Sequence, residues 1–422
     1  MPVAPVLRRS AVTDSGSSWL TRAEPARVGI HLDGEGPLPV GGADTVTLGL
    51  LDHGHVETIT SAKYRRARGP YCLTGDCGTC LVRIDGRPNQ RACLTRVRDG
   101  MRIGTQNKLI RAAPDPTRLV DKFIGTMDHH HFLVRPRVVN QAMQAVAREL
   151  TGFGSLPDHP PDGASAHEVS APDVLVVGAG PAGRAAAQVL GGSQLDILWI
   201  DRGLDSPTAG GLRCRGQTGV FAAYRREGIW AAMTDDGTRP PTLHTIRPRH
   251  VLLCVGARPP TIPLPNNDLP GIVAARGLLR QLRRVDATLA AKCIVIGEGE
   301  TAQRAATRLG ARCIAPSRVT RLEGSTRVEE VVTTDGTLEV QLVAFAPTAA
   351  AAHDLPRQAG AKLRFDGTGF ATVRDDDGRC VTEGPWQVWA AGEVAGVMSD
   401  AGAADDARRV AAALLTAAQE KR

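Results

Sequence analysis

Four cysteines in the first quarter of the chain limit its possible folds more than any other feature. They are Cys72, Cys77, Cys80 and Cys93. The first three follow the spacing C-x4-C-x2-C, and twelve residues separate the third from the fourth. Gly75 and Gly78 lie among them, and a glycine-bearing loop lets backbone N–H groups approach sulfur. This is the spacing of plant-type iron–sulfur loops, so the sequence predicts a [2Fe-2S] cluster and one-electron chemistry.

Zinc and disulfides are the alternatives for these cysteines. Structural zinc sites favour paired C-x2-C knuckles, and only one such pair, Cys77 and Cys80, is present. Nothing in the sequence suggests export, and five further cysteines are scattered: Cys214, Cys254, Cys293, Cys313 and Cys380. We therefore expect thiols in a reducing cytoplasm.

Composition bounds the remaining possibilities. The 422 residues are enough for two or three domains, and 42% of them are hydrophobic. No apolar run reaches the roughly 20 residues that span a bilayer, and the N-terminus lacks the apolar core of a secretory signal. Aromatic residues make up only 4% of the chain, which argues against single-stranded nucleic acid as a partner. We expect the basic run Lys63–Arg68 to be a solvated face or a docking face for an acidic partner subunit.

Residues 25–108 are predicted to form a small α+β domain around the four cysteines. Strands are expected at Val28–Leu32 and Cys80–Ile84, and a helix at Thr45–Asp52 with Asp44 as its N-cap. Residues 1–24 are polar and are predicted to be a flexible tail. Residues 109–170 are predicted to be a connector that contains one helix and ends in a linker rich in Gly and Pro.

A dinucleotide-binding unit is predicted from Val174 onward. The apolar run Val174–Val177 leads into Gly178–Gly183, which reads G-x-G-x-x-G, and an alanine-rich helix follows through Leu190. A second apolar strand, Leu195–Ile200, ends at Asp201. Strand, glycine turn, helix, strand and acidic residue together are typical of a nucleotide-binding βαβ unit.

Each glycine of this turn has an expected role. Gly178 makes the tight turn, Gly180 lets the backbone approach a pyrophosphate, and Gly183 lets helix and strand pack closely. The helix N-terminus supplies N–H donors for phosphate oxygens, and Asp201 can accept hydrogen bonds from ribose hydroxyls.

A second glycine turn occurs at Gly297–Ala302, where the sequence reads G-x-G-x-x-A between an apolar strand and a helix over 303–309. The next strand, Arg312–Ala315, ends without an acidic residue. Glu298 and Glu300 would face phosphates with the wrong charge. The pattern predicts the fold here, whereas nucleotide binding is left open.

Two further strand ends complete the first site. The run 250–255 ends at Gly256, and the run 387–391 ends at Gly392 and Glu393 before a helix over 403–419. These positions can lie beside a cofactor's ribityl-pyrophosphate portion, or they can be plain strand-end turns. The predicted nucleotide-binding residues are Gly178, Ala179, Gly180, Pro181, Ala182, Gly183, Asp201, Arg202, Gly256, Gly392 and Glu393.

As a whole, the layout resembles the α subunits of multi-subunit amine dehydrogenases and oxidases, the group of heterotetrameric sarcosine oxidase, opine oxidase, hydroxyproline dehydrogenase and hydrogen cyanide synthase. The resemblance covers nearly all of residues 28–418. The segments that carry it are 63–72, 90–94, 99–101, 133–154, 174–183, 251–260, 269–271 and 388–396.

The resemblance implies an α/β protein: a ferredoxin-like [2Fe-2S] domain followed by a flavoprotein fold with two dinucleotide-binding, Rossmann-like domains. These would be an FAD or nucleotide domain over 171–285 and 346–422, and an NAD-like domain over 286–345. A partner β subunit similar to D-amino-acid oxidase would oxidise the amine. This chain would pass electrons between flavin and cluster toward an unknown acceptor, with no catalytic residue of its own.

Two departures from the family pattern leave the cofactor of the first groove open. Only residues 203–217 separate Asp201 from the segment that follows, where the family has a longer stretch, so elements that would cover a flavin are missing. The family also has Glu where Asp201 stands and Asp where Glu393 stands. NAD or another adenine nucleotide is therefore an alternative to FAD.

Two other functions remain as alternatives. The chain could be a freestanding NAD(P)H-dependent reductase that accepts hydride at Gly297–Ala302. It could also be a non-catalytic scaffold with a structural adenine nucleotide, in which the cluster alone conducts electrons.

Overall fold

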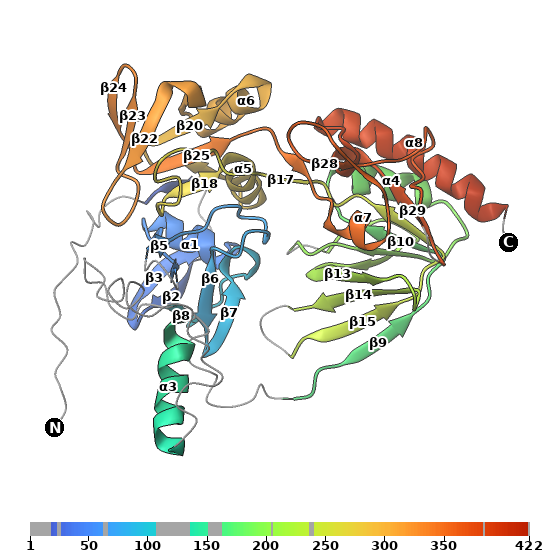
Figure 1. Cartoon of the computed structure of the whole chain (residues 1–422), viewed down its shortest axis with the longest axis horizontal. Coiled ribbons are helices and arrows are strands. Elements are labelled where there is room, and N and C mark those ends of the chain that lie inside the picture. The colour runs from blue at the N-terminus through green and yellow to red at the C-terminus, as the bar shows by residue number, and fades with distance from the viewer. Residues whose placement is uncertain are drawn as a thin grey trace. The chain divides into compact units, whose positions relative to one another are not determined.

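The computed structural model describes residues 18–22, 27–61, 66–106, 136–150, 163–203, 206–235, 240–382 and 385–420 (Figure 1). The chain forms two compact units. Unit 1 comprises Met1–Asp158 and Thr261–Ala346, and unit 2 comprises His159–Pro260 and Pro347–Arg422. Each unit therefore combines segments that are far apart in the sequence.

The N-terminal part of unit 1 is a five-stranded sheet of order β3-β2-β8-β6-β7. Two of its hairpins turn through Asp33-Gly34 and Asp85-Gly86, all at positive φ, which suits tight hairpin turns. The strands are β2 (Arg27–Leu32), β3 (Glu35–Gly41), β6 (Leu81–Ile84), β7 (Arg87–Arg91) and β8 (Arg102–Thr105). Helix α1 (Val46–Asp52) is buried against this domain. The expected α+β domain around the cysteines is confirmed.

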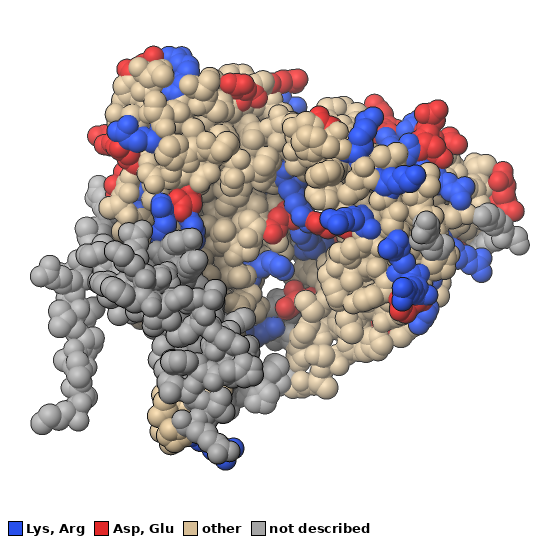
Figure 2. Space-filling view, in the orientation of Figure 1, with Lys and Arg blue, Asp and Glu red and all other residues tan. Residues whose placement is uncertain are grey.

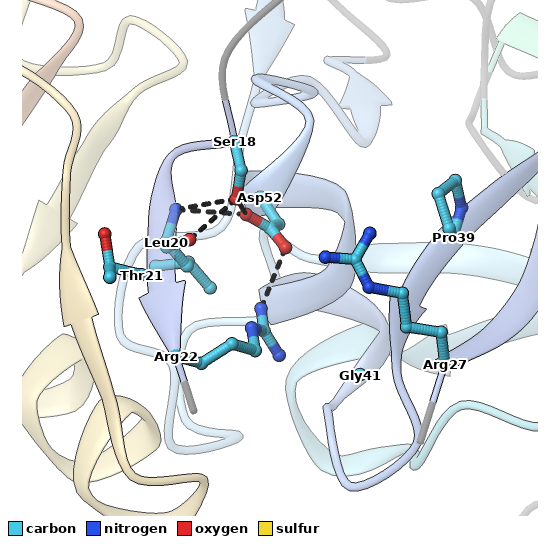
Figure 3. A pocket seen from close by; sticks show the side chains of 8 residues that line it. All are labelled: Ser18, Leu20, Thr21, Arg22, Arg27, Pro39, Gly41 and Asp52. Atoms are coloured by element: carbon cyan, nitrogen blue, oxygen red, sulfur yellow. Dashed lines mark hydrogen bonds and ion pairs between the residues drawn. The ribbon is translucent and has the colours of Figure 1, made fainter. Parts of the chain in front are cut away.

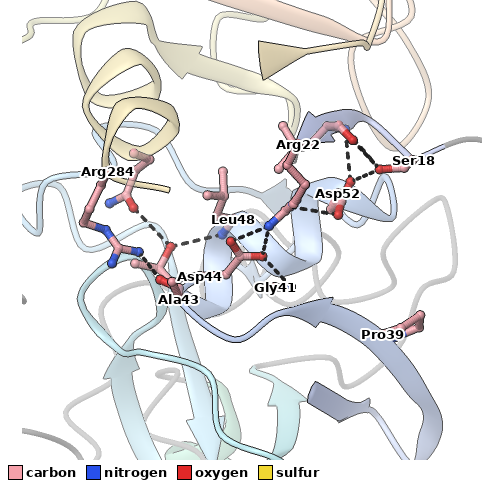
Figure 4. A network of polar contacts seen from close by, with 12 residues as sticks. Ser18, Arg22, Pro39, Gly41, Ala43, Asp44, Leu48, Asp52 and Arg284 are labelled. Atoms are coloured by element: carbon pink, nitrogen blue, oxygen red, sulfur yellow. Dashed lines mark hydrogen bonds and ion pairs between the residues drawn. The ribbon is translucent and has the colours of Figure 1, made fainter. Parts of the chain in front are cut away.

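The cap of α1 differs from the prediction. Thr45 is the N-cap, and its Oγ1 accepts a hydrogen bond from the Leu48 N–H at 3.1 Å. Asp44 is instead fully buried and binds the Arg22 guanidinium at 2.7 Å (Figure 4). Burial raises the pKa of Asp44, and the hydrogen bond and charge of Arg22 oppose that rise. Asp44 therefore serves as a buried ion-pair partner.

The predicted tail over residues 1–24 is wrong for its last part. Strand β1 (Leu20–Arg22) pairs antiparallel with β19 (Ala287–Leu289). Trp19 and Leu20 are 6% and 5% exposed, so burial of these two apolar side chains outweighs the polar character of the segment.

The second part of unit 1 is a parallel sheet of order β18-β25-β20-β21. Its strands are β18 (Ile272–Ala274), β20 (Cys293–Gly297), β21 (Arg312–Ile314) and β25 (Leu342–Ala346). Helices α5 (Ala275–Arg284) and α6 (Gly299–Leu309) share a core with one face, and β22 (Val319–Glu323), β23 (Glu330–Thr333) and β24 (Gly336–Glu339) lie on the other. The predicted domain boundary at 285 placed β18 and α5 elsewhere, but β18 hydrogen-bonds to β25 and so belongs to this sheet.

The basic run Lys63–Arg68 is partly used inside unit 1. Arg66 and Arg68 both form ion pairs with Asp268, and residues 62–65 lie outside the described residues. Unit 1 also contains β4 (Ile59–Thr60), β5 (Ala67–Arg68), α3 (Arg137–Leu150) and the short 3-10 helices Ala92–Leu94 and Pro316–Arg318.

Unit 2 has three layers. Its central parallel sheet has the order β12-β11-β10-β16-β29, made of β12 (Arg213–Arg215), β11 (Ile197–Ile200), β10 (Val174–Val177), β16 (His250–Leu253) and β29 (Gln387–Ala390). Helices α4 (Pro181–Leu190) and α8 (Asp400–Gln419) pack side by side on one face of it (Figure 1).

A second sheet packs on the other face of this central sheet. It has the order β13-β14-β15-β9, made of β13 (Thr218–Tyr224), β14 (Ile229–Thr234), β15 (Thr242–Ile246) and β9 (His167–Ser170). Strand β9 lies in the predicted linker, where its parallel pairing with β15 decides the conformation. The remaining elements are β17 (Ala257–Arg258), β26 (Ala350–Ala351), α7 (Asp354–Gln358), β27 (Leu363–Phe365), β28 (Phe370–Thr372) and the 3-10 helix Gly392–Ala395.

Charged side chains of both signs are interspersed over the face that Figure 2 shows. In the described part of the chain, no helix is both long enough and apolar enough to cross a membrane.

Candidate iron–sulfur and nucleotide sites

The structure brings the four predicted cluster ligands together in unit 1. Cys72, Cys77 and Cys80 lie on the loop 71–80 between β5 and β6, here called the cluster loop, and Cys93 lies in the 3-10 helix after β7. The Sγ atoms of Cys80 and Cys93 are 3.4 Å apart. Cys77 is exposed, whereas the other three are buried. A residue at the surface and three below it form a site with one solvent-facing edge.

Backbone N–H groups of the cluster loop point at sulfur. The Sγ of Cys72 accepts hydrogen bonds from the N–H groups of Asp76 at 3.2 Å, Cys77 at 3.3 Å and Thr74 at 3.5 Å. Gly75 has φ +84°, and a Cβ there would lie 2.5 Å from Leu94 Cδ1. Glycine at this position lets the loop close over Cys72.

The thiol pKa values follow from hydrogen bonds among the four cysteines. Hydrogen bonds from the Cys77 and Cys93 thiols, assisted by backbone N–H groups, hold the pKa of Cys72 far below its usual range, and the pKa of Cys77 is raised in turn. The Cys93 thiol likewise lowers the pKa of Cys80, and its own pKa is raised by hydrogen bonds to Cys72 and Cys80. The four thiols thus interact closely enough to share protons, and binding of a metal would release those protons.

This donor set fits a two-iron cluster, in which each iron needs two thiolates. Cys72 and Cys77 each donate a backbone N–H to the other's Sγ, at 3.5 and 3.3 Å, and the Sγ atoms of Cys80 and Cys93 are 3.4 Å apart. Among the described residues, no group of three or more His, Cys, Asp and Glu side chains is arranged around a single metal ion.

In unit 2, the first glycine turn, residues 178–183, joins β10 to α4. Gly178 has φ +107°, and a Cβ there would lie 2.3 Å from the Cys254 carbonyl oxygen. A Cβ on Gly183 would lie 1.9 Å from the Gly178 carbonyl oxygen, whereas one on Gly180 would meet nothing within 4 Å. The two outer glycines are thus required by packing, and the middle one leaves space open at the helix N-terminus.

Asp201 lies at the end of β11, as its place in the sequence indicates. Its carboxylate accepts hydrogen bonds from the N–H of Ala179 at 2.7 Å and the N–H of Gly203 at 2.6 Å. The side chain therefore ties the glycine turn to the end of the neighbouring strand. Pro181 and Ala182 begin α4, and Arg202 is exposed.

The other predicted residues lie at the same carboxyl edge of the sheet. Gly256 has φ +75°, and a Cβ there would lie 3.2 Å from Glu393 Oε2. Glu393 is 8% exposed. Gly392 has φ +78°, and a Cβ there would lie 2.8 Å from that of Ala182. Strand ends and glycine turn thus converge as the sequence predicts, while nucleotide binding by these residues stays a prediction.

Two residues of this site were not found from the sequence. The carboxylate of Asp406 accepts the Gly392 N–H at 2.8 Å and binds the Arg374 guanidinium at 2.8 Å. The pKa of Asp406 is lowered, because hydrogen bonds and the Arg374 charge outweigh burial, which acts in the opposite direction. The spacing along α8 could have revealed Asp406 from the sequence. It lies three residues after Ala403 and four before Val410, so it shares the buried face of the helix with them.

The second glycine turn, residues 297–302, joins β20 to α6 in unit 1. A Cβ on Gly297 would lie 2.4 Å from the Ala346 carbonyl oxygen and 3.0 Å from the Ala302 Cβ, so the turn is tightly packed. Glu298 and Glu300 are exposed at the helix N-terminus. The fold predicted here is confirmed, and two carboxylates stand where phosphate would bind.

The pocket of about 260 Å³ in Figure 3 contains none of these predicted residues. Among the residues that line it, Asp52 accepts hydrogen bonds from Ser18 Oγ, the Leu20 N–H at 3.0 Å and Arg22 at 2.9 Å. These polar groups bind one another and anchor strand β1 to helix α1.

The fold and the cysteine site together define a class: an electron-carrying [2Fe-2S] domain joined to a Rossmann-like oxidoreductase fold. The family model of the 2Fe-2S iron-sulfur cluster binding domain matches residues 26–108. Hydrogen cyanide synthase subunit HcnA of Pseudomonas aeruginosa is 41% identical over 78 residues, which are 18% of this chain and 73% of that subunit. The alpha subunit of sarcosine oxidase from Rhizobium meliloti is 28% identical over 168 residues, 38% of this chain but only 17% of that subunit.

The whole fold has a counterpart among solved structures. The crystal structure of L-proline dehydrogenase from P. horikoshii superposes with a TM-score of 0.68 at 18% identity, covering 96% of this chain and 78% of that chain. The chain belongs to the group of oxidoreductase α subunits that carry an N-terminal [2Fe-2S] domain.

Proposed function

We propose that this chain is the electron-transfer subunit of a multi-subunit flavin-dependent amine or amino-acid dehydrogenase or oxidase. The observation that carries the proposal is the cluster site: two sulfur pairs, with three cysteines buried and Cys77 at the surface. Such a site can exchange single electrons at one exposed edge while protein covers the rest. Relatives of this chain are named as subunits of hydrogen cyanide synthase and sarcosine oxidase, which supports a hetero-oligomer.

In this proposal Cys72, Cys77, Cys80 and Cys93 hold the cluster, which supplies one-electron transfer. The first glycine turn and the neighbouring strand ends hold a dinucleotide, with FAD favoured and NAD or another adenine nucleotide as the alternative. A flavin accepts two electrons and releases them singly, so it is a suitable neighbour for a one-electron carrier. Asp201 and Glu393 then orient the nucleotide, and the backbone of residues 178–183 faces its phosphates.

We place oxidation of the C–N bond on a partner flavoprotein similar to D-amino-acid oxidase. No catalytic constellation of this chain enters the reaction as we propose it. The amine donor is therefore recognised by the partner, and this chain determines where the electrons go next.

Reconstitution tests this assignment. The purified chain is analysed for iron, acid-labile sulfide and flavin, then titrated anaerobically with NADH and with amines such as sarcosine and proline. It is next coexpressed with a flavoprotein encoded beside it, and the titrations are repeated. We expect the cluster absorbance to bleach with an amine only in the complex. Rapid bleaching of the isolated chain by NADH would instead identify a freestanding reductase, and a flavin-free chain with an intact cluster would favour the scaffold.

A further inference from the structure

One face of helix α5 is built to receive the cluster loop. Gly277, Gln281 and Arg284 recur at intervals of four and three residues, so they share one side of the helix. A Cβ on Gly277 would lie 2.0 Å from the Cys72 carbonyl oxygen, so only glycine fits there. Arg284 donates a hydrogen bond to the Ala43 carbonyl oxygen at 2.6 Å (Figure 4). All these contacts lie within unit 1.

Gln281 occupies the centre of this face and is 6% exposed. Its Nε2 donates to the carbonyl oxygens of Leu73 at 3.0 Å and Cys93 at 3.2 Å, and its Oε1 lies 3.3 Å from Thr45 Oγ1. Because carbonyl oxygens can only accept, the side-chain nitrogen must face them. One side chain thus joins the cluster loop to the separate segment that supplies the fourth cysteine.

The Leu73 contact reaches the sulfur through a single peptide group. The C=O of Leu73 and the N–H of Thr74 belong to the same peptide, and that N–H donates to Cys72 Sγ at 3.5 Å. A hydrogen bond at the carbonyl end fixes the peptide plane and polarises its N–H. Hydrogen bonds to cluster sulfurs stabilise the reduced, more negative state and so raise the reduction potential.

We propose that Gln281 is a positioning residue that sets the reduction potential of the cluster. We also propose that the cluster domain packs on α5, a helix of the second dinucleotide-type fold, which is the sheet β18-β25-β20-β21 with α5 and α6. The proposal needs the cluster but no partner subunit, amine or nucleotide. It therefore stands or falls independently of the reaction proposed above.

The test uses the full-length chain with its cluster. Gln281→Met keeps a similar volume and removes every hydrogen bond, and Gln281→Glu keeps the shape but removes the amide donor. Gln303→Met is the matched control, because Gln303 lies exposed on the neighbouring helix α6. The readouts are the midpoint potential from a redox titration, the EPR spectrum of the reduced cluster, and iron and sulfide per chain.

We expect both Gln281 variants to have a lower potential and altered EPR g-values, and the Gln303 variant to match the wild type. Loss of one net hydrogen bond predicts a reduced-to-oxidised ratio that is roughly three- to tenfold smaller at a fixed potential. A tenfold change corresponds to about 59 mV for one electron.

Cluster-loaded variants with unchanged potential and EPR spectrum would overturn the proposal, because Gln281 would then hold the cluster loop in place without tuning the cluster.

Discussion

The two glycine turns of this protein are alike in sequence and differ in structure. The first, 178–183, keeps open space at Gly180 and has Asp201 at the end of the next strand. The second, 297–302, presents Glu298 and Glu300 to solvent at its helix N-terminus, and the strand after it ends without an acid. The first turn can receive an anionic ligand, whereas the second carries its own negative charge.

The same kind of dinucleotide fold has different surroundings in the two units. The second dinucleotide-type fold contributes to unit 1 through α5, whose Gly277 and Gln281 contact the cluster loop. In unit 2, the same kind of fold positions strand ends around an open glycine turn. A glycine-rich fingerprint therefore predicts the strand–turn–helix geometry in both places, but it does not by itself decide where a ligand binds.

Removal of one buried ligand should have the largest effect. Cys93→Ala leaves the buried Cys80 without its paired sulfur. We expect iron and labile sulfide per chain to fall by about tenfold or more, because the second iron loses half of its protein ligands. Nucleotide binding by unit 2 should persist. The control is Cys214→Ala, and a normal iron content in the Cys93 variant would refute the ligand assignment.

Gly277→Ala tests the contact between helix α5 and the cluster loop. The added methyl group would collide with the Cys72 carbonyl oxygen, so helix and loop must separate. We expect a loss of roughly 1–3 kcal/mol in the free energy of unfolding of unit 1, with partial loss of iron. Hydrogen exchange localises the effect. Gly192→Ala, where a Cβ meets nothing within 4 Å, should be neutral; equal effects in the two variants would contradict the packing.

The first turn allows a comparison of two glycines three residues apart. Gly183→Ala should destabilise unit 2 by roughly 1–3 kcal/mol, because its Cβ meets the Gly178 carbonyl oxygen. Gly180→Ala should leave stability nearly unchanged but weaken nucleotide binding, since its methyl group would fill the open space. Denaturation followed by tryptophan fluorescence and calorimetric titration with FAD and NAD separate the two effects. Unchanged nucleotide binding in the Gly180 variant would show that the nucleotide does not bind at this turn.

The second turn is tested by neutralising its charge. Glu298→Gln together with Glu300→Gln should change stability by no more than about 0.5 kcal/mol per site, because both side chains are exposed. The reduction potential and the occupancy of the cluster should also be unchanged. NADH binding measured by fluorescence is expected to be absent from a Gly180→Ala variant, in which the first turn is blocked. Tight NADH binding by the Gly180→Ala variant would break the contrast between the two turns.

A small pH effect should distinguish unit 2. Burial, followed by the charge of Arg215, lowers the pKa of His244 in the folded state, with Glu168 opposing. The neutral folded form is favoured, so stability is full above the unfolded pKa of about 6.5 and declines as the pH falls below it. Four of the five tryptophans lie in unit 2, so fluorescence-detected denaturation from about pH 8 to about pH 5 reports how the stability of unit 2 depends on pH. His244→Gln should flatten this dependence, and His53→Gln should not.

Helix α1 and strand β1 show where local patterns fail. Asp44 and Thr45 are both good N-caps by residue type, and only the buried Arg22 decides that Asp44 is used for an ion pair. The local sequence around strand β1 offers only Trp19 and Leu20 as a sign of burial. Its pairing partner β19 lies more than 260 residues away along the chain. Local propensity cannot report a partner at that separation.

The sequence by itself predicted the cluster ligands and determined both glycine turns, because the spacing of the cysteines matches the chemistry of iron and the turns obey the steric limits of a short strand–helix connection. Tertiary structure decided that Gln281 hydrogen-bonds to the cluster loop, that Asp406 takes the Gly392 N–H, and that β18 and α5 belong with the cluster domain. These contacts join residues that are distant along the chain, and only the packing of complementary buried surfaces selects among the many possible partners.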